Sequence, residues 1–359
     1  MKAVVLTEPK VLQLADIPEF KLTEENHVLV KVKACGICGS DLRYWAGDNP
    51  WSLHTLGKHV SSPPNMVMGH EFAGEVVKVN SKENEHFLGK RVGVQSYRVC
   101  GKCRFCKTGR ENLCRNMIHI GHAQGWGEMD YYPGAYAEYC IGWADLLHPI
   151  PDHITYAQAA MADILCVAVH VVGRTRIYEG AHILCIGGGP AGLSIAQVTK
   201  VLGAEKIILS DPSPIARQVI GQFNTFTVVD PGEDNIADQI KDTVGDQKFA
   251  AIFDSVGSLE TINMALPLLE ESGTYVNLVV HGASINFDMR ALGSERTITT
   301  SSNAYYRDLT KAFELLNSGI VDVKPWITHR FRLEDFQKAF ELLTKSPKEA
   351  YKVVFEPWG

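Results

Sequence analysis

One stretch of the chain, residues 182–192, reads HILCIGGGPAG, a short apolar run followed directly by a glycine-rich turn. Helix-forming residues follow over 193–202, and Gly203 provides the end of that helix. A second apolar run, 206–210, leads to Asp211, about 20 residues beyond the turn. This alternation of strand, turn, helix and strand predicts an α/β domain with a parallel sheet.

The glycine-rich turn fits the pattern G-x-G-x-x-G through Gly187, Gly189 and Gly192. Between a strand and a helix, this pattern indicates a doubly wound Rossmann domain, in which backbone N–H groups at a helix start approach a pyrophosphate. Asp211 would accept hydrogen bonds from ribose hydroxyls and repel a 2′-phosphate. The first basic side chain after it is Arg217, which we expect to line the same site. The sequence therefore predicts NAD, rather than NADP, as the cofactor.

The rest of the chain indicates a second, β-rich domain. Alternating or β-branched runs at 28–33, 75–79 and 91–94 predict half-buried strands. Thr155 and Gln158 have capping-box spacing, so a helix should begin there and continue through His170. Further elements are expected as strands at 249–254, 274–280 and 351–355 and as helices near 307–318 and 333–344. These patterns predict a β-rich domain of 1–153 and 302–359 and an α/β domain of 154–301.

Length and charge narrow the class of protein. The 359 residues suffice for about two domains, and 45% hydrophobic with 21% charged residues is a globular composition. A net charge of −6, from 35 basic and 41 acidic side chains, argues against a nucleic-acid or anionic-membrane partner. No apolar run reaches the roughly 18 residues of a spanning helix, and Glu8 comes too early for a signal peptide. We therefore expect a cytoplasmic enzyme without a nucleic-acid or membrane partner.

The spacing C-x2-C-x2-C-x7-C joins Cys100, Cys103, Cys106 and Cys114. With an odd total of nine cysteines, such clustering indicates metal binding in a reducing compartment rather than disulfides. Four thiolates close a tetrahedral zinc site without a vacant position, which makes the site structural. An iron–sulfur cluster also accepts four thiolates, and four free buried thiols are the remaining interpretation.

A second set of metal-ligand residues comes from two separate segments. Cys38 lies in GICGSD, residues 36–41, and His70 and Glu71 lie in GHE, residues 69–71. A thiolate, an imidazole and a carboxylate are the mixed ligands expected of a catalytic zinc that keeps one position open. Alone, each of these residues would more often be a packing residue. Beside the cysteine cluster and the dinucleotide turn, they indicate a catalytic metal site and favour zinc in the cluster.

In this order, the motifs resemble the zinc-dependent medium-chain dehydrogenases of the alcohol dehydrogenase superfamily, over essentially the whole chain. Tyr44-Trp45 and the segment THRF, residues 328–331, resemble the polyol or sorbitol dehydrogenase branch. The resemblance implies a GroES-like catalytic domain built from both termini, a Rossmann domain between them and a substrate cleft at their junction. It also implies one structural and one catalytic zinc per subunit and a homo-oligomer, either a dimer or a tetramer.

By position in the family pattern, Cys38, His70 and Asp163 would hold the catalytic zinc, with Glu71 as a direct or water-mediated contact. Asp163 lies seven positions before His170, as the acidic residue of the polyol branch does. Cys166 has the softer ligand atom and competes for the same role. It falls where that branch has a small serine, so we expect Cys166 to be a packing residue.

The resemblance also assigns a proton path. Ser40 would hydrogen bond the substrate hydroxyl and pass its proton outward, while Asp41 would orient a zinc ligand. Arg43 joins this catalytic set but stands where many relatives have a histidine, so the relay beyond Ser40 departs from their pattern. Two stretches, 48–65 and 119–133, depart as well and suit either the rim of a polyhydroxylated-ligand site or an ordinary surface or subunit-contact loop. Their aromatic and polar residues are Trp51, His54, His59, His122, Gln124, Trp126 and Tyr131.

Four functions compete at this point. The first is NAD-dependent oxidation of a secondary hydroxyl on a polyol, cyclitol or sugar derivative. The second is L-threonine 3-dehydrogenase, because Asp163 followed by Ala168-Val169-His170 resembles that branch too. A general secondary alcohol dehydrogenase is third. A dinucleotide-binding protein without catalysis is the remaining class, against which the presence of Cys38, His70 and Ser40 argues.

Overall fold

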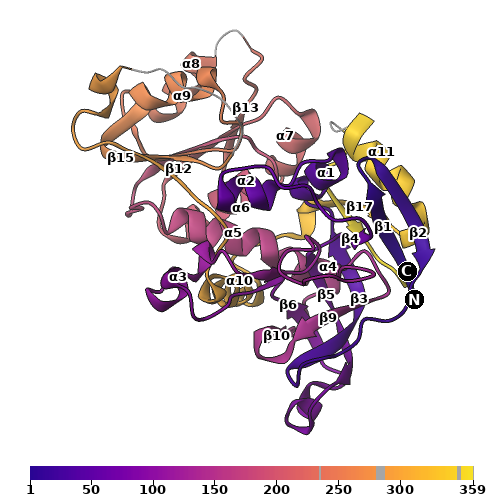
Figure 1. Cartoon of the computed structure of the whole chain (residues 1–359). Helices are drawn as coiled ribbons and strands as arrows, with labels where there is room; N and C mark the ends of the chain where they lie inside the picture. The colour runs from indigo at the N-terminus through magenta and orange to yellow at the C-terminus, as the bar shows by residue number, and fades with distance from the viewer. Residues whose placement is uncertain (234–235, 280–287, 346–348, 359) are drawn as a thin grey trace. The chain divides into compact units, whose positions relative to one another are not determined.

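The computed structural model describes residues 1–233, 236–279, 288–345 and 349–358. The chain forms two compact units, a terminal unit of Met1–Asp163 with Tyr305–Gly359 and a central unit of Ile164–Ala304 (Figure 1). Within the described ranges, no helix has the length and apolar character needed to cross a membrane.

The terminal unit is built on a seven-stranded sheet in the order β10-β6-β5-β3-β18-β17, with β9 also pairing with β3. The C-terminal strand pairs antiparallel with β3, Phe355 opposite Cys35, so both ends of the chain build this unit. The strands are β3 (His27–Gly36), β5 (Glu71–Val79), β6 (Arg91–Val94), β9 (Tyr139–Trp143), β10 (Leu147–Pro149), β17 (Ile327–Phe331) and β18 (Lys352–Phe355). Smaller sheets join β1 (Lys2–Glu8), β2 (Val11–Asp16) and β4 (Met66–Val67), and β7 (Tyr97–Arg98) with β8 (Ile118–His119).

Alternation of buried valines with partly buried lysines explains why this segment forms strand β3. Val28, Val30 and Val32 are fully buried, while Lys31 and Lys33 between and after them are only partly buried. Valine side chains restrict χ1 and pack well on a pleated surface, so this run favours a strand with one core face. The helices of the unit are α1 (Gly39–Ala46), α2 (Pro50–Leu56), α3 (Arg104–Lys107), α4 (Tyr156–Ala160), α10 (Tyr306–Ser318) and α11 (Phe336–Lys345).

The central unit holds a six-stranded parallel sheet in the order β13-β12-β11-β14-β15-β16. Counted from β11, this is the strand order 3-2-1-4-5-6 of the Rossmann fold, which confirms the doubly wound prediction. The strands are β11 (His182–Ile186), β12 (Lys206–Ser210), β13 (Thr227–Val229), β14 (Phe249–Asp254), β15 (Leu269–Asn277) and β16 (Thr297–Thr300). The helices are α5 (Ala162–Val172), which begins two residues before the unit does, α6 (Pro190–Val201), α7 (Pro214–Ile220), α8 (Ile236–Val244) and α9 (Leu259–Ala265).

Two elements differ from the sequence prediction. The single helix expected from Thr155 through His170 is two helices, because α4 ends at Ala160, with Met161 as its C-cap residue, and α5 starts at Ala162. The capping box of Thr155 and Gln158 is present at the start of α4. The strand expected at 274–280 begins earlier, at Leu269, and ends at Asn277, and residue 280 lies outside the described residues.

Candidate functional site

The antiparallel pairing of β3 with β5 creates the candidate catalytic metal site. Gly36, at the end of β3, lies opposite Glu71, at the start of β5. The chain leaves β3 toward Cys38, the N-cap residue of α1, and enters β5 directly after His70. Ligand atoms of Cys38, His70 and Glu71 therefore lie within 4.8 Å of one another, and His70 and Glu71 are buried. This donor set, one thiolate, one imidazole and one carboxylate, fits zinc.

Asp41 supports the imidazole of His70 from within the protein. Its side chain is fully buried, and its Oδ1 lies 3.4 Å from Nδ1 of His70. Its Oδ2 accepts hydrogen bonds from the backbone N–H of Cys38 (2.9 Å) and from the hydroxyl of Tyr136 (2.6 Å). A carboxylate on the far nitrogen of a metal-binding histidine fixes the orientation of its ring.

The electrostatics of this pair follow from its burial. Burial alone would lower the pKa of His70, but the charge and hydrogen bond of Asp41, with Cys38, raise it well above its usual value in the metal-free protein. Burial alone would raise the pKa of Asp41. The charge of His70 and the hydrogen bonds from the Tyr136 hydroxyl and the Cys38 backbone outweigh the effect of burial, and the pKa of Asp41 is lowered. A metal ion at this site would therefore displace a proton from His70 on binding.

Lys352 is a site residue that the sequence analysis missed. Its Nζ lies 2.5 Å from Oε2 of Glu71 and donates a hydrogen bond to the carbonyl of Ile37 (2.8 Å). The lysine and glutamate side chains are 4% and 1% exposed. Glu71 thus has a cationic partner before any metal binds. A lysine at the start of the apolar strand 352–355 was the available signal, because lysines are rarely buried unless they are paired.

Asp163 interacts electrostatically with His70 and Glu71, but its carboxylate is not among the ligand atoms that lie within 4.8 Å of one another in this metal-free arrangement. The groups that could hold a metal, among the described residues, join Cys38 and His70 to Glu71 but not to Asp163. Its Oδ1 accepts a hydrogen bond from the Ser96 hydroxyl (3.2 Å). Burial and the charge of Glu71 raise the pKa of Asp163 to about 6, against the lowering effects of His70, Ser96 and Lys352. Cys166, one turn further along α5, is also buried.

The proton path expected from the resemblance consists of Ser40, whose hydroxyl oxygen is buried, and Arg43, which is paired with Asp48. Oγ of Ser40 is buried and has no hydrogen-bond partner among the described residues. Arg43 forms an ion pair with Asp48, Nε to Oδ2 at 3.4 Å. No hydrogen bond of the described residues joins Arg43 to Ser40. The geometry therefore leaves Ser40 available to a ligand and engages Arg43 in a surface contact.

The end of β8 and the loop after it bring two histidines to this site, the buried His119 and the half-buried His122. The ring of His122 lies 4.5 Å from that of His70 and 4.0 Å from that of His119, between ring centroids. Both ring nitrogens of His122 are buried without a partner among the described residues. Burial and the neighbouring imidazoles hold its pKa well below the usual value, so the ring is neutral. Two other aromatic residues of these loops have packing contacts: Trp126 stacks on Trp143, and Trp51 packs beside the cysteine cluster.

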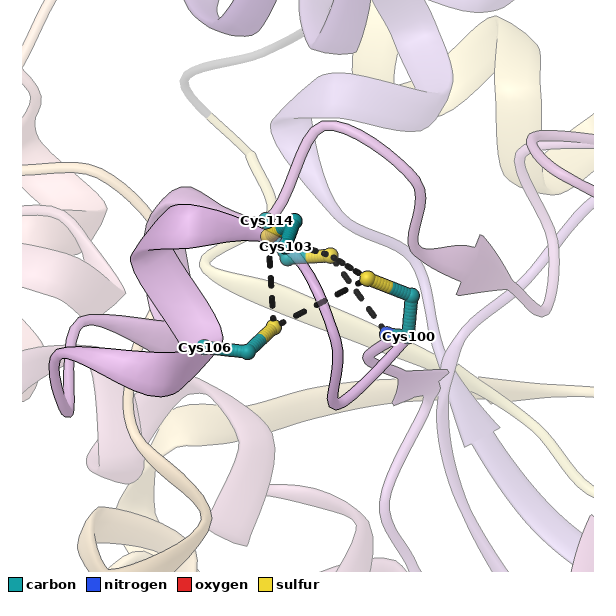
Figure 2. A group of neighbouring side chains, drawn as sticks. All are labelled: Cys100, Cys103, Cys106 and Cys114. Carbon is teal, nitrogen blue, oxygen red and sulfur yellow. Dashed lines mark hydrogen bonds between the residues drawn. The ribbon is translucent and has the colours of Figure 1, made fainter.

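The four cysteines come together as their spacing predicts (Figure 2). The Sγ atoms are 3.5 Å apart for Cys100–Cys114 and for Cys103–Cys106, and 3.9 Å apart for Cys100–Cys106 and for Cys103–Cys114. A tetrahedron of sulfurs around zinc, with Zn–S of about 2.3 Å, has edges of about 3.8 Å. The spacing suits one ion and leaves no room for a multi-iron cluster. None of the nine cysteines, all of which lie among the described residues, forms a disulfide.

The surroundings of the cluster shift the pKa values of its thiols in different directions. Desolvation raises the pKa of the Cys100 thiol, but backbone N–H groups of Lys102 and Cys103 lower it, to about 6. Desolvation and the neighbouring Cys103 raise the pKa of Cys106 to about 12. Zinc, which binds thiolates, would favour deprotonation of all four.

In the central unit, the glycine turn and Asp211 lie together at the carboxyl ends of β11 and β12. Asp211 accepts hydrogen bonds from the backbone N–H of Gly188 (2.8 Å) and of Ser213 (2.7 Å). Gly187 has φ of +95°, and a side chain at Gly192 would meet the Gly187 carbonyl at 1.9 Å, so both positions need glycine. Arg217, which we expected to line the cofactor site, donates to the Asp211 carbonyl (2.9 Å) and pairs with Asp230 (2.8 Å).

Comparisons with known proteins agree with this architecture. Family profiles match the alcohol dehydrogenase GroES-like domain at residues 24–152 and the zinc-binding dehydrogenase domain at 190–318. Sorbitol dehydrogenase of Bacillus subtilis (strain 168) is 28% identical over 99% of this chain and 97% of its own. L-threonine 3-dehydrogenase of Rhizobium rhizogenes is 30% identical over 96% of this chain and 95% of its own. The structure of 2R,3R-butanediol dehydrogenase from B. subtilis aligns with a TM-score of 0.83 at 27% identity, covering 99% of both chains.

The chain belongs to the zinc-dependent medium-chain dehydrogenases of the alcohol dehydrogenase superfamily. It is an alcohol dehydrogenase that uses zinc and a nicotinamide cofactor, and its substrate is a small molecule.

Proposed function

We propose that this enzyme oxidises a secondary hydroxyl of a neutral polyol, cyclitol or sugar derivative, with NAD as the hydride acceptor. The observation that carries the proposal is a set of buried polar atoms of the terminal unit that have no hydrogen-bond partner among the described residues. Those on uncharged side chains include Ser40 Oγ, both ring nitrogens of His122, Trp51 Nε1 and the side-chain amide of Gln95. A buried polar group without a partner is costly, so such a set indicates a ligand with several hydrogen-bonding groups.

The charges of the site favour a neutral ligand over threonine. Two cations near Cys38, Lys352 on β18 and Arg43 on α1, are both engaged: Lys352 with Glu71 and Arg43 with Asp48. Neither offers a free charge to the carboxylate of an amino acid. The unpartnered atoms named above, which exclude those of the carboxylates and of His70, belong to uncharged side chains, which suit hydroxyl groups.

In this proposal each residue has a distinct task. Cys38 and His70 hold the catalytic zinc with Asp163 and Glu71, and bound zinc supplies a Lewis acid that makes the substrate hydroxyl more acidic. Ser40 accepts the hydroxyl proton, and Asp41 fixes the ring of His70. The turn of Gly187, Gly189 and Gly192 receives the pyrophosphate of NAD.

A second candidate, L-threonine 3-dehydrogenase, is favoured by the 30% identity to that enzyme of Rhizobium rhizogenes. One assay separates the two: NADH formation measured with polyols, cyclitols, sugars, L-threonine and simple secondary alcohols. We expect the highest kcat/KM with a neutral polyhydroxylated compound. A higher value with L-threonine would replace the first proposal by the second.

Asp211 carries the cofactor preference. Its carboxylate lies at the end of β12 beside Gly188, where a 2′-phosphate would be repelled. We expect kcat/KM to be far higher with NAD than with NADP, and equal values would refute this assignment. We also propose that the enzyme works in the cytoplasm as a homo-oligomer, a dimer or a tetramer. The cysteines, which form no disulfide, support a reducing compartment, and β16 lies at the edge of the six-stranded sheet as formed by the described residues.

A further inference from the structure

His122 is held in a fixed position by its neighbours. Its ring stacks on His119 at 4.0 Å, with an interplanar angle of 19°, and lies 4.6 Å from the ring of Tyr44. His119 is anchored in turn, because its Nδ1 donates to the carbonyl of Ile120 (2.7 Å) and its own carbonyl accepts from Nε1 of Trp126 (2.9 Å). A ring held this way presents its nitrogens with little loss of side-chain freedom on binding a ligand.

The nitrogens of His122 lie beside the metal-ligand group. Ligand atoms of Asp41, His70 and His122 fall within 4.8 Å of one another. This second triad shares His70 with the Cys38 group, so the two compete for one imidazole. Zinc favours the group that offers a thiolate, and Oδ2 of Asp41 already accepts two hydrogen bonds. The nitrogens of His122 therefore remain for another ligand.

We infer that His122 is a specificity-determining residue that hydrogen bonds a second substrate hydroxyl, on the carbon next to the one that is oxidised. The inference rests on the proposed function and narrows its substrate class to vicinal diols within larger polyols, cyclitols or sugars. Both ring nitrogens of His122 are buried without a partner among the described residues, and an imidazole nitrogen can hydrogen bond a hydroxyl group. A site that hydrogen bonds a substrate hydroxyl discriminates against the analogue that lacks it.

The test compares butane-2,3-diol with butan-2-ol, and each polyol that the enzyme oxidises with its analogue lacking the neighbouring hydroxyl. His122→Phe keeps a stacked ring and removes both nitrogens, whereas His122→Gln keeps a hydrogen-bonding group. His86→Phe is the matched control, because His86 is exposed and bonds the Glu83 carbonyl far from this loop in sequence. Zinc per chain and the Kd of the diol in the presence of cofactor are measured for every variant.

We expect His122→Phe to lower kcat/KM for the diol roughly 10- to 100-fold, the scale of an unpaired buried hydrogen-bonding group. The mono-alcohol should change less than about threefold, and His122→Gln should lose less than His122→Phe. Kd for the diol should rise in parallel, with zinc content equal to wild type. His86→Phe should match the wild type throughout.

Several outcomes would overturn the inference. Equal losses for diol and mono-alcohol would mean that His122 does not bind the second hydroxyl. Loss of zinc from both His122 variants would make it a support of the metal site instead. A wild-type enzyme that oxidises mono-alcohols as well as diols would remove the vicinal-diol requirement while leaving zinc- and NAD-dependent oxidation intact. No NADH formation with any neutral alcohol would refute the proposed function itself, and this inference with it.

Discussion

Replacing Lys352 by methionine would preserve the reach of the side chain and remove the cation that pairs with Glu71. Nζ lies 2.5 Å from Oε2 of Glu71, in a pair whose side chains are 4% and 1% exposed. Removing one partner of a buried ion pair leaves an uncompensated charge, which costs about 3–5 kcal/mol. We therefore expect zinc-free Lys352→Met to be less stable than the wild type by about that amount.

Zinc should restore part of this loss, because Glu71 also lies within the group formed by Cys38 and His70. A divalent ion there would replace the missing ammonium as the partner of the carboxylate. Zinc should therefore stabilise Lys352→Met more than it stabilises the wild type. In the variant, zinc should also bind the carboxylate of Glu71 more tightly. Turnover should then be slower, because the zinc position that is open to the substrate would be lost.

Urea unfolding of the metal-free and zinc-loaded proteins measures these effects. Lys352→Arg is the matched control because it keeps the charge, and it should lose much less stability than Lys352→Met. The double variant Glu71→Gln/Lys352→Met removes both charges and should be more stable than Lys352→Met alone. The reasoning is refuted if zinc-free Lys352→Met lies within about 1 kcal/mol of the wild type, or if the double variant is no more stable than the single one.

Three further predictions concern other groups. Cys103→Ser should release one zinc ion and lower Tm by about 5 °C or more, since 1 kcal/mol is worth roughly 2–4 °C in a unit of this size. Cys140→Ala is the control, because Cys140 is a buried cysteine outside the cluster, and it should keep all its zinc. Equal metal content in both variants would contradict the structural assignment. Asp163→Ala should weaken zinc binding about 10- to 100-fold and nearly abolish turnover, while Cys166→Ser leaves both within a few-fold; metal analysis and kinetics decide, and the reverse pattern would contradict the ligand assignment. Burial lowers the pKa of His148 to about 4. As pH falls from about 6.5 to 4, the histidine therefore binds a proton in the unfolded chain but stays unprotonated in the native protein. The part of the free energy of unfolding that depends on a neutral His148 is present above pH 6.5 and is lost toward pH 4. His148→Leu should therefore lose less stability than the wild type over this range, by up to about 3 kcal/mol. Identical slopes of unfolding free energy against pH in the two proteins would contradict this prediction.

The local features of the fold were predictable from sequence. The strand-turn-helix over 182–202 follows from short-range patterns, because glycine alone tolerates the φ of +95° at Gly187 and the close approach at Gly192. The cysteine cluster was predictable for the same reason, since its four ligands lie on one short loop. The meeting of Cys38 with His70 was inferred from their residue types beside the other motifs and from the family pattern, because no local pattern specifies how β3 pairs with β5.

Contacts between distant segments were not predictable in this way. The pairing of Lys352 with Glu71 depends on β18 joining the sheet next to β3, a register that no local pattern specifies. The packing of His122 against His70 depends on the path of an irregular loop. For Arg217, whose position after Asp211 suggested a cofactor contact, the structure adds a pairing with Asp230, and the cofactor contact stays a prediction.

The central claim is that hydroxyl oxidation takes place at a zinc ion held by Cys38 and His70. Its most direct test measures NADH formation and zinc per chain in the wild type, in Cys38→Ser and in Cys35→Ala. Cys35 is the matched control, because it is a buried cysteine at the end of β3 that lies outside the metal-ligand group. We expect Cys38→Ser to lose one zinc ion and at least about 10³-fold in kcat, since a Lewis acid contributes several kcal/mol to such a reaction, while Cys35→Ala retains both. Turnover by Cys38→Ser at the wild-type rate, or equal losses in the two variants, would contradict the claim.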